Sequence, residues 1–111
     1  MTLSVSAYSR GADGGFVEIA LASDLAGFES TRRSFFGTQW ARALGLRLLP
    51  YLGQQSELWV EGDLLRELAE EAAALRAAVR GRDDEEYWVS RLANIATAIA
   101  LAGPAGAICI C

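Results

Sequence analysis

The stretch DDEEYWVSRLANIATAIALAGPAGAICIC, residues 83–111, decides the fold of this chain. Asp83 is a suitable N-cap, and Glu86 three residues later completes a capping box. An apolar stripe follows at helical spacing, formed by Trp88, Leu92, Ile95, Ile99 and Ala102. Gly103 and Pro104 end this helix, and an apolar strand follows over residues 107–111. Because this strand is apolar on both faces, we predict that it lies inside a sheet.

The composition indicates one globular domain, 1–111, that buries a core without disulfides or metals. The formal net charge of −4 argues against nucleic-acid binding, which needs a basic surface, and favours a basic partner. The Met1 end lacks the basic and apolar regions of a signal peptide. The apolar run of the last helix is shorter than the roughly 20 residues that span a bilayer. We therefore expect a cytoplasmic protein with no membrane partner.

The residues that usually carry catalysis are scarce. The chain has no histidine, which removes the usual general base, and its only cysteines are Cys109 and Cys111. We interpret the two cysteines as reduced, buried strand residues. The alternatives are a redox pair or two thiolate ligands, but a zinc site needs two further ligands. The expectation is a protein that is not an enzyme and has no cofactor and no metal.

The rest of the chain predicts an α+β fold. Strands are indicated over 2–8 and 16–22, and helices over 38–49, 63–80 and 84–102. Residues 57–61 are either a short edge strand or an extended lead-in to the next helix. Residues 23–37 are ambiguous, with a short helix over Leu25 and Phe28 as one interpretation. The expected architecture has two layers: a mainly antiparallel sheet of three to four strands, packed on one face by about three helices. The residues expected to be buried are Leu68, Leu75, Leu92, Ile95, Ile99, Ile108 and Ile110.

Two of these helices carry further signals. In helix 38–49, Thr38 is the expected N-cap, Leu44 and Leu48 belong to the inner stripe, and Pro50 ends the helix. Helix 63–80 is capped by Asp63 and ends at Gly81. The short connection to the next helix predicts an antiparallel hairpin.

Candidate partner-binding residues come from four places. On helix 63–80, Glu67, Glu70 and Glu71 are expected to point outward, and Asp83 and Asp84 lie at the opposite end of the hairpin. These acids either form a face for a basic partner or are solvated and capping charges. Arg32 and Arg33, beside two phenylalanines, are either a contact site or solvated residues of a connection. Trp59 lies in an edge element, where a partly exposed ring could anchor an interface.

Several segments resemble a known protein group. The resemblance covers residues 34–111 and rests on the segments SFFGT (34–38), GLRLLPYL (45–52), LLRELAEE (64–71) and RLANIATAI (91–99). This order is similar to that of the small α+β immunity proteins of bacterial polymorphic-toxin systems. The resemblance implies a cytoplasmic protein that binds a cognate toxin and blocks it, and no individual binding residue is carried over.

A second hypothesis is a homo-oligomeric structural or adaptor module, such as a homodimer. The two-faced apolar strand and the strongly apolar last helix motivate this alternative, because such surfaces are buried against a partner when their own chain does not cover them. On this hypothesis, Ile110→Lys disrupts assembly.

Overall fold

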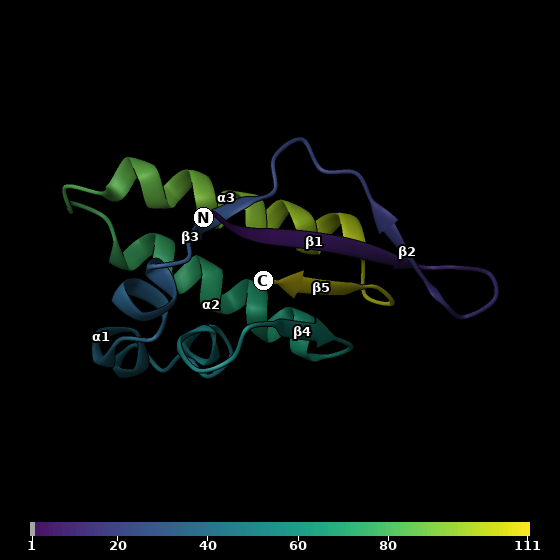
Figure 1. The fold of residues 1–111 in the computed structure, drawn as a ribbon, viewed down its shortest axis with the longest axis horizontal. Coiled ribbons are helices and arrows are strands. Elements are labelled where there is room, and N and C mark those ends of the chain that lie inside the picture. The colour runs from purple at the N-terminus through teal and green to yellow at the C-terminus, as the bar shows by residue number, and fades with distance from the viewer. Residues whose placement is uncertain (1) are drawn as a thin grey trace.

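The computed structural model describes residues 2–111 and has an α+β fold, as predicted (Figure 1). Its strands are β1 (Thr2–Arg10), β2 (Phe16–Ile19), β3 (Leu25–Phe28), β4 (Leu58–Glu61) and β5 (Ala107–Ile110). Its α-helices are α1 (Gln39–Ala43), α2 (Leu64–Ala78) and α3 (Glu85–Ala102). A π-helix, η1 (Arg32–Phe36), and a 3₁₀ helix, η2 (Leu49–Gly53), complete the described chain.

The sheet has the strand order β2–β1–β5–β4, and β3 pairs with the N-terminal end of β1. All of these pairings are antiparallel. The described chain thus contains five strands, where three to four were predicted. Strand β5 lies between β1 and β4, and all four of its residues are buried, which confirms its predicted place inside the sheet.

Strand β3 was not predicted, and the short helix over Leu25 and Phe28 is wrong. Tertiary contacts explain the extended backbone. The Asn94 side-chain amide of α3 donates a hydrogen bond to the Leu25 carbonyl at 2.9 Å. Gly27 packs beside α3, where an added Cβ would lie 3.4 Å from the Trp88 ring. These partners lie far along the chain, so local propensity could not indicate them.

The predicted helix over 38–49 is much shorter in the structure. The Thr38 hydroxyl caps α1 by accepting a hydrogen bond from the Ala41 amide at 3.1 Å, as expected. However, α1 ends at Ala43, and Gly45 adopts a φ of 89°, which breaks the helix. Leu44 is 41% exposed and does not belong to the inner stripe.

Pro50 does not end a long helix. It lies in the first turn of η2, where its missing N–H costs no hydrogen bond.

Helices α2 and α3 pack together and are connected by residues 79–84 (Figure 1). The buried stripe of α3 follows Trp88, Leu92, Ile95, Ala98 and Ala102. Ile99 was predicted to be buried, but the stripe passes through Ala98 and Ile99 is only partly buried, packed against the core.

The start of α3 also differs from the prediction. Asp84, not Asp83, occupies the N-cap position, and its carboxylate binds Arg82 at 2.9 Å instead of capping the helix. The Glu85 carboxylate accepts a hydrogen bond from the Gly81 amide at 2.8 Å.

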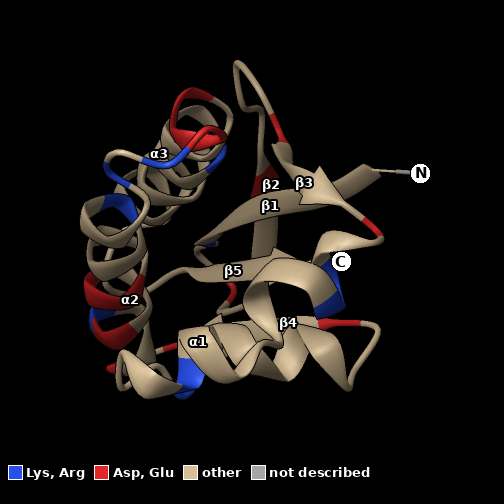
Figure 2. Cartoon of the chain, turned by 90° about the vertical axis from the view of Figure 1, so that its left-hand side faces the viewer, with Lys and Arg blue, Asp and Glu red and all other residues tan. Residues whose placement is uncertain are grey.

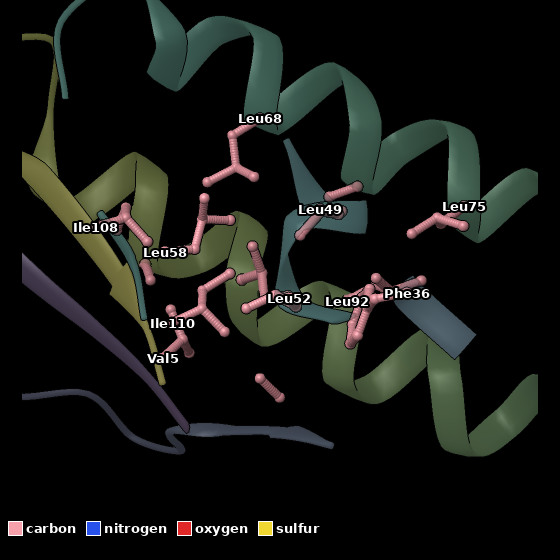
Figure 3. Close-up of a cluster of buried hydrophobic side chains, with 14 of the residues drawn as sticks. Val5, Phe36, Leu49, Leu52, Leu58, Leu68, Leu75, Leu92, Ile108 and Ile110 are labelled. Atoms are coloured by element: carbon pink, nitrogen blue, oxygen red, sulfur yellow. The ribbon is translucent and has the colours of Figure 1, made fainter. Parts of the chain in front are cut away.

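One hydrophobic core lies between the sheet and the helices. Figure 3 shows strand residues meeting residues from α2, α3, η1 and η2. The fully buried members include Val5, Phe36, Leu49, Leu52, Leu68, Leu75, Leu92, Ile95, Ile108 and Ile110. Except for Ile99, the residues predicted to be buried are confirmed. Because Ile110 belongs to this core, the substitution Ile110→Lys would disrupt folding and does not test an oligomer interface.

Candidate protein-binding face

The helices cover only one face of the sheet. Leu3, Val5 and Ala7 of β1 point into the core, so the side chains between them point to the other face. Figure 2 shows α2 and α3 together on one side of the sheet. We call this opposite side the outer sheet face, formed by Ser4, Ser6, Tyr8, Arg10, Phe16, Glu18, Trp59, Glu61, Ala107 and Cys109.

Three aromatic rings meet on the outer sheet face. The ring centroids of Tyr8 and Trp59 lie 5.2 Å apart, and those of Phe16 and Trp59 lie 5.4 Å apart in an edge-to-face arrangement. These separations are typical of favourable aromatic pairs. The Arg10 guanidinium lies 4.1 Å from the centre of the Phe16 ring. Residues from β1, β2 and β4 thus form one aromatic cluster, in which Trp59 remains 40% exposed.

Two carboxylates lie beside this cluster. Glu61 accepts a hydrogen bond from the Trp59 indole nitrogen at 2.8 Å. Glu18 lies opposite Tyr8 in the β1–β2 register. Burial raises the pKa of the Tyr8 phenol, and the nearby negative charge of Glu18 raises it further. The cluster therefore combines ring surface with negative charge.

The rings also cover the small side chains of β5. Ala107 and Cys109 are buried, and in the register they lie opposite Tyr8 and Trp59 respectively. Burial raises the pKa of the Cys109 thiol to about 12, and the charges of Cys111 and Glu57 contribute. Glu57 lies directly before β4 and two residues from Trp59, so the alternation of side chains places it on the same side as Trp59, at the border of the outer sheet face. A thiol with so high a pKa is protonated at neutral pH and is a poor nucleophile.

Glu71 does not point outward as predicted; it is 5% exposed. Its carboxylate accepts hydrogen bonds from the amides of Arg47, Leu48 and Leu49 at 2.8–2.9 Å. The amides of Arg47 and Leu48 lie just before η2, and that of Leu49 is in its first residue. Glu71 therefore holds the segment between α1 and η2 against α2. The structure therefore assigns Glu71 a structural position.

The other predicted acidic residues lie at separate places. Glu67 forms an ion pair with Arg47, and Glu70 is exposed on the same helix. Asp83 and Asp84 lie in the connection between α2 and α3. Figure 2 shows the acidic residues of α2 and those at the start of α3 as separate groups. None of these acids belongs to the outer sheet face.

The two arginines of η1 differ in their surroundings. Arg32 donates hydrogen bonds to the carbonyls of Gln55 and Ser56 at 2.8 and 2.9 Å, and it binds Glu29 at 2.8 Å. Its guanidinium thus holds η1 against the segment that leads into β4. Arg33 is exposed.

Trp59 is the only predicted partner-binding residue that lies on the outer sheet face. Strand β4 is at the edge of the sheet and the Trp59 ring is partly exposed, as predicted. Its neighbours Tyr8, Phe16 and Glu18 were not predicted from the sequence. Alternation along β1 and β2 already placed these side chains away from the core, but the order of the strands was needed to bring them to Trp59.

Within residues 2–111, no group of three or more cysteines, aspartates or glutamates is placed to hold a metal ion. No helix in this part of the chain is long and apolar enough to cross a bilayer. The expectations about cofactors, nucleic acid and membrane partners stay predictions.

Comparisons with protein-family models, curated proteins and solved structures found no match for this chain. The resemblance of residues 34–111 to immunity proteins therefore stays a prediction. The outer sheet face is a surface that carries aromatic rings and carboxylates. Such a surface is suited to recognising another macromolecule by shape and charge.

Proposed function

We propose that this chain is a non-enzymatic, cytoplasmic immunity protein that neutralises a cognate bacterial toxin by forming a stoichiometric complex. The observation that carries the proposal is the outer sheet face, where Tyr8, Phe16 and Trp59 form an aromatic cluster beside carboxylates. The resemblance of residues 34–111 to immunity proteins supports the same function.

The chemistry of this face selects a basic partner. Partly exposed tryptophan and tyrosine rings provide much of the binding energy at protein interfaces. The carboxylates of Glu18, Glu57 and Glu61 are accompanied on these strands by the single guanidinium of Arg10. A basic toxin surface would therefore be attracted to this face, and added salt would slow the association.

The first experiment identifies the partner and tests neutralisation. The tagged protein is used to capture its partner from a lysate of the source bacterium, and the captured protein is then expressed alone and together with this chain. We expect one dominant partner at equal stoichiometry that stops growth alone and is harmless in co-expression. A partner that is harmless alone, or toxic despite co-expression, contradicts the proposal.

Charge-reversed variants locate the binding surface. The double variant Glu57→Lys/Glu61→Lys changes the border of the outer sheet face. The matched control, Glu70→Lys/Asp83→Lys, makes the same change in net charge on the exposed acidic groups of the helices. We expect the first variant to lose protection and affinity by at least tenfold and the control to keep both. The reverse result would place the toxin on the helices.

The homo-oligomeric module is the alternative outcome of the same capture. If the tagged chain retrieves only copies of itself, and sedimentation shows a stable dimer, the immunity function is wrong.

A further inference from the structure

Strand β4 forms one edge of the sheet, and its backbone directions follow from the register. Ser4 and Cys111 exchange two backbone hydrogen bonds, of 2.8 and 2.9 Å, between β1 and the end of β5. Along a central strand, residues that are hydrogen-bonded to one neighbouring strand alternate with residues that are hydrogen-bonded to the other. Because Cys111 is bonded to β1, Ile110 and Ile108 direct their backbone N–H and C=O groups to β4. Their partners there are Leu58 and Val60.

The remaining backbone groups of β4 point away from the sheet. Trp59 lies between Leu58 and Val60, and Glu61 follows Val60. The N–H and C=O groups of Trp59 and Glu61 therefore face outward, away from β5. No described residue outside β5 forms a backbone hydrogen bond with either of them. Their side chains lie on the outer sheet face, so the open edge and the aromatic cluster meet at the same two residues.

We propose that the partner adds an antiparallel strand to the β4 edge and that this strand carries lysine or arginine at alternate positions. This inference rests on the proposed function and names how the partner is held. In an antiparallel pair, the partner residues that exchange hydrogen bonds with Trp59 and Glu61 have their side chains on the same face as these residues. Basic side chains at those positions would contact the Trp59 ring and the carboxylates of Glu57 and Glu61.

The same geometry disfavours a second copy of this chain. Two β4 strands paired about Trp59 would bring Glu57 of each copy opposite Glu61 of the other. Like charges directly opposite each other destabilise strand pairing. A pairing centred on Glu61 would instead place the Glu61 carboxylates of the two copies opposite each other. In these two registers the charge pattern therefore favours a basic strand over self-association.

A synthetic peptide tests this inference without a known toxin. The probe is the peptide TKTKTKT, added to the ¹⁵N-labelled full chain, and the readout is amide hydrogen exchange by NMR. We expect exchange of the Trp59 and Glu61 amides to slow at least tenfold at saturating peptide. The Glu18 amide, which by the same alternation points outward from the opposite edge strand β2, serves as the internal reference and should not change.

Backbone methylation separates strand addition from simple charge attraction. Methylating the lysine amides removes the donors that face β4, whereas methylating the threonine amides removes donors that point away. We expect the first peptide to lose the protection of Trp59 and Glu61 and the second to retain it. Equal behaviour of the two peptides, or no binding of TKTKTKT at millimolar concentration, overturns the inference.

The two proposals fail in different ways. If a toxin is captured and neutralised but the Trp59 and Glu61 amides exchange as in the free chain, the strand addition is wrong and the immunity function stands. If the peptide protects these amides as expected but no toxin is found, the edge-binding inference stands and the proposed function is wrong.

Discussion

Among single residues, Glu71 has the most demanding position in the described chain. Its carboxylate is buried and serves three consecutive backbone amides of residues 47–49. An acceptor of this kind replaces the helical hydrogen bonds that residues 38–49 lose where Gly45 breaks the helix. Removing the negative charge would leave these three amides, of which that of Leu49 is buried, poorly satisfied.

Replacing Glu71 by glutamine should therefore destabilise the protein. Glutamine keeps the shape but places an amide donor group against backbone N–H donors, so we expect a loss of about 2–3 kcal/mol in the free energy of unfolding. The control Glu70→Gln changes an exposed neighbour and should stay within about 0.5 kcal/mol. Urea unfolding measures both. Equal stabilities of the two variants would contradict the assigned role.

Cys109 and Cys111 should differ in reactivity. Burial and nearby negative charge raise the pKa of the Cys109 thiol from 9.0 to about 12, whereas Cys111 is exposed. Because only the thiolate reacts, and a raised pKa keeps the thiol protonated, a thiol reagent at pH 8 should modify only Cys111 in the folded chain. In urea both should react. Rapid modification of Cys109 in the folded variant Cys111→Ser would show that this thiol is not shielded.

Among the elements, the start of β5 depends on a close approach of backbones. A Cβ at Gly106 would lie 2.3 Å from the carbonyl oxygens of both Ala102 and Tyr8. These backbone atoms belong to α3 and β1 and cannot move independently of the core. Glycine therefore allows the chain to leave α3 and enter the sheet directly beside β1.

We expect Gly106→Ala to cost about 3 kcal/mol or more, at or above the upper end of the usual cost of overpacking. The matched control is Gly15→Ala, where an added Cβ would meet only the flexible Asp13 side chain, at 3.3 Å. The control should lose less than about 1 kcal/mol. Thermal and urea unfolding measure the difference, and a well-tolerated Gly106→Ala would refute the close approach.

The orientation of α3 has its own test. Ile95 is fully buried, while Ile99 is only partly buried beside the core. Ile95→Ala should cost about 2–5 kcal/mol, and Ile99→Ala should cost clearly less, because it leaves a smaller buried cavity. Urea unfolding with unchanged m-values compares the two. A larger loss for Ile99→Ala would mean that the helix is rotated.

The elements also show where sequence reasoning succeeds. Strongly patterned segments, such as α2, α3 and β5, were predictable because their own apolar spacing determines which face is buried. Strand β3 and the break after α1 were not, because they depend on distant partners such as Asn94 and Glu71. The burial of Glu71 could have been predicted from one feature of the sequence. Glu71 lies between Leu68 and Leu75 on the inner side of the helix.

For the molecule as a whole, strand order is what produces the candidate site. Tyr8 and Trp59 are far apart in the sequence, and β5 brings their strands into one sheet. The sequence indicated that Trp59 is partly exposed. Its candidate partner-binding residues came from four places along the chain, and these places remain separate in the structure. The outer sheet face unites rings and carboxylates from three strands, and this arrangement required the topology.

The most direct test of the central claim is hydroxyl-radical footprinting of the chain, free and bound to its captured partner. The outer sheet face is the proposed interface, so oxidation of Trp59 and Tyr8 should fall at least severalfold in the complex. Tyr51, which is exposed on η2 outside this face, is the reference and should be oxidised equally in both states. Unchanged oxidation of Trp59 together with protection of Tyr51 would contradict the account.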